Sequence, residues 1–142
     1  MPLLPPYGFF IVVLLAVALG VLICHFRRVR SATAKKLYLS QCDVALQYPQ
    51  FANPEGQLDM REKSVGGSKT AFEQYEWYVA RLVYVLDECM MLSRRSRWRA
   101  VADTQLGVHK HYFGSDYYKK QNYLPHYSET MRQLIEQQGK GA

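Results

Sequence analysis

The pattern of apolar and polar residues divides the chain into one uninterrupted apolar segment and a longer stretch with helical periodicity. Residues 7–26 contain no Asp, Glu, Lys or Arg, and twelve of the residues from Phe9 to Cys24 are Leu, Ile, Val or Phe. Twenty helical residues extend about 30 Å, which is the thickness of the hydrocarbon core of a bilayer. Those twelve residues favour membrane insertion by roughly 4–7 kcal/mol in total. The pattern therefore predicts one transmembrane helix over residues 7–26, preceded by a short tail over residues 1–6.

Helical periodicity is clearest within residues 70–92. Six apolar residues recur there at intervals of three or four and would form one buried face: Phe72, Tyr75, Val79, Leu82, Leu86 and Cys89. Thr70 stands three residues before Glu73, as in a capping box, so the central helix is expected to begin at Thr70.

Shorter helices are expected on both sides of the central helix. One covers about residues 31–48 and ends before a proline. A helix over about residues 96–113 would turn Trp98 towards the core. A short helix capped by Ser115 or Asp116 follows it. A last helix is expected in the segment 125–138.

These elements predict an all-α fold with a single membrane span. The sequence has almost no strand signal. The domain organisation is a transmembrane helix, a basic juxtamembrane segment over residues 27–36, a helical cytoplasmic domain of four or five helices over residues 37–138 with a loop at about 49–69, and a disordered tail over residues 139–142.

Charge is unevenly distributed and predicts the orientation of the span. The formal net charge is +6, and five cationic residues follow the apolar run within ten positions, before any acidic residue. Cationic flanks stay on the cytoplasmic side of a membrane, which predicts that the N-terminus lies outside and that the domain lies in the cytoplasm. The residues expected at the membrane interface are His25, Arg27, Arg28, Arg30, Lys35 and Lys36.

A cleavable signal sequence is the main alternative to a membrane span. A signal needs a basic N-terminal region and a site of small residues after its apolar core. The opening "MPLLPPYG" contains no basic side chain, and the apolar run ends in "CHFRR". These features favour a permanent membrane anchor.

Three later segments resemble a loose group of short bacterial proteins of unknown function. The segments are "YVLDECMMLSRR", "HYFGSDYYKK" and "YLPHYSETMRQLIE". The resemblance covers roughly residues 35–137 and concerns the architecture. It implies one N-terminal span followed by an all-helical cytoplasmic domain, and it implies no activity.

Motifs for catalysis, metals or cofactors are not found in the sequence. There is no H-E-x-x-H, no C-x-x-C, no G-x-S-x-G and no Walker A motif. His109 and His111 are two residues apart, so on a helix they diverge by about 200°. We expect surface or partly buried histidines, no metal and no cofactor. Glu88 is expected to pair with Arg81, Arg95 or Arg99, and a proton-handling role for Glu88 is the less favoured alternative.

A second basic cluster and a pair of small residues are the candidate binding features. The cluster mixes cations with an aromatic ring, a composition that suits either anionic lipid or nucleic acid. Ala16 and Gly20 are spaced to let another transmembrane helix approach closely. The candidate docking residues are Arg94, Arg95, Arg97, Trp98 and Arg99.

Together these features predict a non-enzymatic, single-pass membrane protein. It would be an accessory subunit or adaptor of a larger membrane complex, with the lipid bilayer and other membrane-protein subunits as its partners. The alternative is a membrane-tethered protein that binds nucleic acid or anionic lipid through the cluster at residues 94–99. An enzyme that uses Glu88 as an acid is a third hypothesis.

Overall fold

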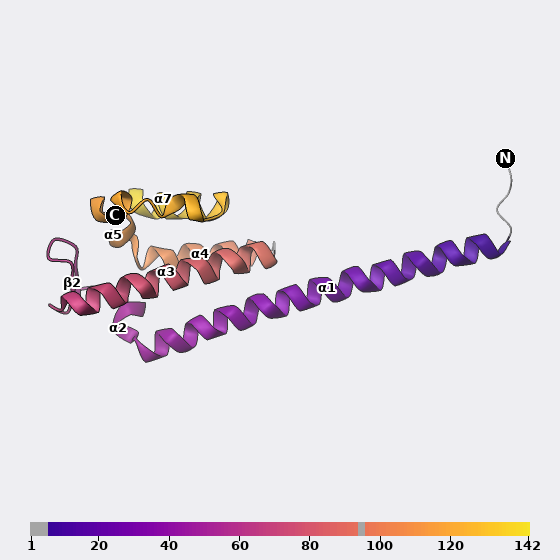
Figure 1. Cartoon of the computed structure of the whole chain (residues 1–142), viewed down its shortest axis with the longest axis horizontal. Coiled ribbons are helices and arrows are strands. Elements are labelled where there is room, and N and C mark those ends of the chain that lie inside the picture. The colour runs from indigo at the N-terminus through magenta and orange to yellow at the C-terminus, as the bar shows by residue number, and fades with distance from the viewer. Residues whose placement is uncertain (1–5, 94–95) are drawn as a thin grey trace.

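A computed structural model describes residues 6–93 and 96–142 of the chain. About 78% of the chain is helical, with one long apolar N-terminal helix followed by several short helices (Figure 1). The predicted all-α class is confirmed.

The first helix, α1 (Pro6–Gln47), has 42 residues and is longer than expected. It contains the predicted span, the basic segment at 27–36 and the predicted helix at about 31–48. These form one helix because no proline interrupts the chain between Tyr7 and Gln47. Its N-terminal half extends away from the other helices (Figure 1). An 18-residue window there has a mean hydropathy of 2.9 and no buried residue, so by length and composition this part can be a membrane span or a signal sequence.

The C-terminal half of α1 packs against α3 (Lys69–Leu92), and the two helices run antiparallel. The fully buried Ala34 lets the helices approach closely, and its carbonyl accepts a hydrogen bond from the thiol of Cys89 at 3.1 Å. Further along, Arg81 donates to the side chains of Gln41 at 3.1 Å and Ser40 at 2.9 Å. These contacts join the helix that carries the apolar segment to the centre of the domain.

The predicted loop at 49–69 is more ordered than expected. It contains α2 (Pro49–Ala52) and an antiparallel hairpin of two short strands, β1 (Leu58–Asp59) and β2 (Ser64–Val65). The turn of this hairpin forms because the Asp59 carboxylate accepts the backbone N–H groups of the two residues that follow Met60.

The start of α3 also differs from its prediction. Gly66 and Gly67 have φ angles of 56° and 80°, which a residue with a side chain rarely adopts. This turn leaves Ser68 in an extended conformation, and its hydroxyl accepts the N–H of Ala71 at 3.1 Å. Ser68 is therefore the N-cap, and the predicted cap at Thr70 is wrong.

The remaining helices pack around α3. They are α4 (Ser96–Gly107), α5 (Lys110–Phe113), α6 (Asp116–Lys120), a 3-10 turn η1 (Leu124–His126) and α7 (Glu129–Lys140). Helix α4 also contacts α1 through Trp98. The predicted helix at 96–113 is divided because α4 ends at Gly107, a poor helix former. The last helix begins at Glu129, later than predicted, and extends to Lys140, so residues 139 and 140 are helical rather than a disordered tail.

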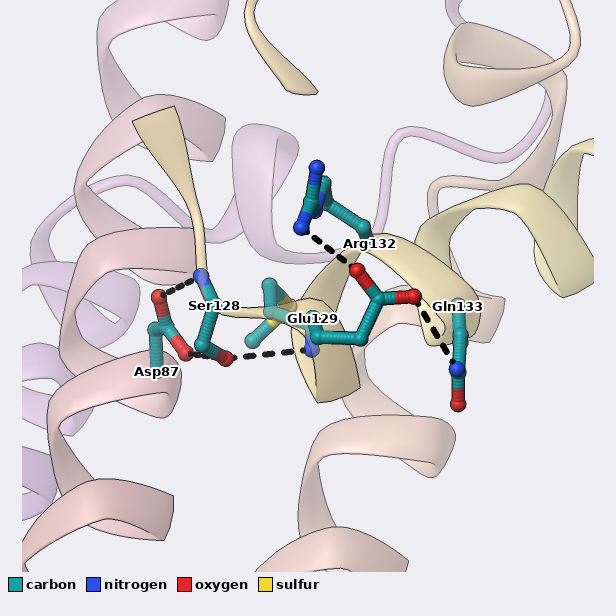
Figure 2. Close-up of polar contacts among 6 residues, drawn as sticks. Asp87, Ser128, Glu129, Arg132 and Gln133 are labelled. Carbon is teal, nitrogen blue, oxygen red and sulfur yellow. Dashed lines mark hydrogen bonds and ion pairs between the residues drawn. The ribbon is translucent and has the colours of Figure 1, made fainter. Parts of the chain in front are cut away.

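A buried carboxylate on α3 positions α7. Asp87 accepts the backbone N–H of Ser128 at 2.9 Å and also the Ser128 hydroxyl (Figure 2). The same hydroxyl accepts the N–H of Met131, so Ser128 is the N-cap of α7. A negative charge near a helix N-terminus is stabilised by the helix dipole. This arrangement accounts for a charged residue in an otherwise apolar interface.

Candidate functional site

The residues predicted at the membrane interface lie along one stretch of α1. His25, Arg27, Arg28, Lys35 and Lys36 are exposed there. The sixth, Arg30, donates from its Nη2 atom to the carbonyl of Met91 at 2.9 Å. The end of the apolar run therefore lies level with the C-terminal end of α3.

The second basic cluster is only partly described by the structure. Arg94 and Arg95 lie outside the described residues, while Arg97 and Arg99 are exposed on the first turn of α4.

Trp98 does not contribute to a docking surface, because its side chain is only 5% exposed. It packs with Ala34 and Cys89 in a small apolar cluster, and its ring lies edge-on to Tyr38 with 5.5 Å between the centroids. Its predicted place in the core is correct, and its predicted place in the docking cluster is wrong.

The two basic sets meet at one cavity between α1, α3, α4 and α7. Arg30, from the predicted interface residues, and Arg99, from the later cluster, both line this cavity. Its volume is about 500 Å³. Its other polar lining is made of hydroxyl groups. The complete lining is Arg30, Met90, Met91, Ser93, Ser96, Arg99, Ser128 and Thr130.

The cavity lies close to the apolar boundary of α1. Arg30 follows Phe26 by four residues, which corresponds to about 6 Å along a helix axis. Ser128, which lines the cavity, donates its N–H and its hydroxyl to the two oxygens of the Asp87 carboxylate (Figure 2). Two guanidinium groups and several hydroxyls make this cavity suited to a phosphate-bearing group. We call it the membrane-proximal cavity, because it lies beside the predicted membrane interface.

The outer face of α3 carries a second candidate feature. Trp77, Tyr84 and Met91 are 79%, 52% and 57% exposed, and they recur every seven residues. Two heptads of helix extend about 21 Å. We refer to these three residues as the outer α3 face. The 3-4 spacing of the buried residues dominates the local pattern, but the Trp-Tyr-Met heptad could have been read from the sequence.

The remaining candidate residues are Glu88 and the pair Ala16 and Gly20. Glu88 is exposed, and among the described residues it makes no ion pair with Arg81 or Arg99. Within the same residues, no group of three His, Cys, Asp or Glu side chains could hold a metal ion. Ala16 and Gly20 are exposed, and nothing lies within 4 Å of a Cβ placed on Gly20, so this surface of α1 is uncovered.

His109 is more deeply buried than expected, with 1% of its surface exposed. Its Nδ1 atom lies at hydrogen-bond distance, 2.9 Å, from the hydroxyl oxygen of Tyr75. Burial lowers the pKa of His109 to about 4, because the charged imidazolium would lose its hydration. His109 is therefore a neutral core residue at neutral pH.

No known protein family, curated protein or solved structure matches the chain. The resemblance to short bacterial single-span proteins stays a prediction.

Proposed function

We propose that the protein is a non-enzymatic, single-pass protein of the bacterial inner membrane that acts as an accessory subunit or adaptor. In this proposal, the outer α3 face binds a helical segment of another membrane-protein subunit. The observation that carries this proposal is the apolar line of Trp77, Tyr84 and Met91 on the exposed face of α3. Aromatic residues and Met are enriched in interfaces between proteins, and exposed apolar lines mark such interfaces.

Continuity of α1 supports a membrane span over a cleaved signal. The helix that contains the apolar residues continues into the core of the domain, where Ala34 and Gln41 are buried against α3. The five cations after Phe26 support a cytoplasmic domain. With no break in α1, the bilayer would fix both the height and the direction of the outer α3 face.

The geometry gives a mechanism for the adaptor. Met91 lies level with Arg30 at the membrane interface, and Trp77 lies about 21 Å further from the bilayer. A partner helix that leaves the membrane beside α1 would meet this line directly. Anchoring both proteins in one membrane raises their effective concentration, so a modest contact area suffices.

Co-purification from gently solubilised membranes tests this function. The wild-type chain, at native expression, should carry a membrane-protein partner that is lost in the double variant Trp77→Ala/Met91→Ala. Tyr84 is left in place because its ring packs on Tyr127. The matched control Leu39→Ala/Val108→Ala removes two exposed apolar side chains elsewhere, and it should retain the partner. A wild-type chain that purifies without any partner would contradict the proposal.

The membrane-proximal cavity favours a second candidate function, the binding of anionic phospholipid. A cationic side chain near an anionic membrane surface contributes about 1 kcal/mol, so Arg30 and Arg99 together contribute about 2 kcal/mol, roughly thirtyfold in affinity. This function is compatible with the adaptor, because a bound headgroup would hold the domain against the membrane.

Native mass spectrometry of the protein after its release from detergent micelles tests whether it binds anionic lipid. Bound phosphatidylglycerol should be retained by the wild-type chain and by Arg61→Gln/Lys140→Gln, and lost from Arg30→Gln/Arg99→Gln. Retention by the last variant would refute the lipid site. Steeply salt-dependent binding of DNA or RNA that is lost in the same variant would favour the nucleic-acid alternative.

A further inference from the structure

A second cavity, of about 340 Å³, lies between α3 and the segment from α5 to η1. It has none of the residues of the membrane-proximal cavity. Six aromatic side chains contribute to its wall: Trp77, Tyr84, Tyr112, Tyr118, Tyr123 and Tyr127. Its volume lies in the range of small-molecule sites, which are lined predominantly by apolar and aromatic side chains.

The cavity has a cation-attracting electrostatic character. Glu76 is the one carboxylate in its wall, and the wall contains no Lys or Arg. Glu76 accepts hydrogen bonds from the hydroxyls of Tyr112 at 3.2 Å and Tyr117 at 3.1 Å, which hold its carboxylate in place. Because each carboxylate oxygen has two lone pairs, both retain capacity for a further donor.

Burial keeps three tyrosines of the wall neutral. Burial raises the pKa of Tyr127 to about 12 and raises the pKa of Tyr112 and Tyr118 further. Neutral aromatic rings present a negative face to a cation, and several such rings around a carboxylate form the arrangement that binds ammonium groups.

The Tyr118 hydroxyl supplies an independent sign of a ligand. Tyr118 is 5% exposed and lines the cavity, and its hydroxyl has no hydrogen-bond partner among the described residues. Its ring is held between Tyr112 and Phe113, with centroids 5.0 and 5.1 Å away. Buried hydroxyls in folded proteins are nearly always paired, so a ligand in the cavity that supplied a donor or acceptor would remove the cost of this unpaired group.

An ammonium group of the chain itself already uses the neighbouring surface. The Nζ atom of Lys63, on the hairpin, lies 5.0 Å from the ring centroid of Tyr117, and Tyr117 in turn donates to Glu76. The hairpin thus shows that an ammonium can be accommodated against a ring of this network.

We propose that this aromatic cavity binds a small organic amine in its protonated form. The ammonium group would donate hydrogen bonds to the Glu76 carboxylate and to the Tyr118 hydroxyl oxygen, and the apolar body would lie against the rings of Trp77 and Tyr123. A primary or secondary amine fits better than a quaternary one, because only N–H groups can satisfy Tyr118. The cavity shares Trp77 and Tyr84 with the outer α3 face. Its key residues, Glu76 and Tyr118, are not part of that face, so variants at these two positions test the amine site without changing the proposed adaptor surface.

Calorimetric titration of the full chain in nanodiscs tests the site with three probes that share one body. These are 2-phenylethylamine, which is protonated at pH 7, neutral 2-phenylethanol and anionic phenylacetate. The amine should bind at least about tenfold more tightly than the alcohol, and phenylacetate should bind least. Equal binding of the three probes, or no binding of the amine in the millimolar range, would overturn the proposal.

Two variants and one matched control locate the binding. Glu76→Gln should abolish the preference for the amine over the alcohol, while Glu73→Gln, one helical turn earlier and exposed, should keep it. Tyr118→Phe should weaken the amine severalfold and leave the thermal stability of the unliganded protein unchanged or higher, because it removes an unpaired hydroxyl. A preference that survives Glu76→Gln, or an amine affinity that Tyr118→Phe leaves unchanged, would refute this site.

Discussion

Acidification should destabilise the domain through His109. The folded-state pKa of this residue is about 4, against an ordinary value of 6.5. Between these values the unfolded chain binds a proton that the folded domain does not, so stability falls as the pH falls from about 6.5 and levels off below about 4. A difference of about 2.5 pKa units corresponds to roughly 3.4 kcal/mol in full, of which about 2 kcal/mol is lost between pH 7 and pH 5.

Urea unfolding of the full chain at pH 7 and pH 5, followed by the fluorescence of the buried Trp98, measures this loss. Other groups also titrate between pH 7 and pH 5. The contribution of His109 is therefore measured as the difference in pH dependence between the wild-type chain and a variant. His109→Gln should remove about 2 kcal/mol of the pH dependence, whatever its effect on stability at pH 7. His111→Gln is the matched control, because His111 is exposed and only two residues away, and it should keep the wild-type dependence. An unchanged pH dependence in His109→Gln would refute the reasoning.

Three further substitutions test the packing by denaturant unfolding. Asp87→Ala should cost about 2–4 kcal/mol, because it removes two hydrogen bonds to a buried charge, whereas the exposed Asp43→Ala should change stability by less than about 0.5 kcal/mol. Gly114→Ala should cost about 1–3 kcal/mol, because its new Cβ would lie 2.9 Å from a backbone oxygen of α7. Gly141→Ala should cost much less, because its new Cβ would make only an ordinary van der Waals contact, 3.7 Å from the carbonyl oxygen of Gln138. Ala34→Leu should cost a similar 1–3 kcal/mol, about the usual cost of overpacking, by forcing α1 away from α3. A stability equal to that of wild type in any of the three would contradict the corresponding contact.

Local sequence patterns were enough to predict those elements whose formation depends only on residues nearby in the chain. The apolar run predicts a helix long enough to cross a membrane because its length and composition are visible without any partner. The six residues of the 3-4 pattern within 70–92 are all buried in α3, because a helix places such positions on one face whatever it packs against. The all-α class follows from these two features.

Errors in the sequence predictions occur where two local signals compete. Thr70 and Ser68 are both acceptable caps, and the left-handed turn at Gly66 and Gly67 decides in favour of Ser68. Two local signals also compete at Trp98. Its cationic neighbours suggest that it lies at the protein surface, whereas its position in the helical pattern suggests that it faces the core. Its contact with Ala34, more than sixty residues earlier, decides for the core.

The existence and the lining of both cavities depend on the tertiary structure and could not be predicted from local sequence patterns. Arg30 and Arg99 come from basic runs far apart in the sequence and meet because α1 and α3 pack antiparallel and α4 follows α3. Glu76 meets two tyrosines of the later helices in the same way. A local pattern specifies the face of a helix on which a residue lies, whereas the identity of the opposing residue depends on how the helices pack together. Long-range packing therefore decided the sites, and local periodicity decided the elements that carry them.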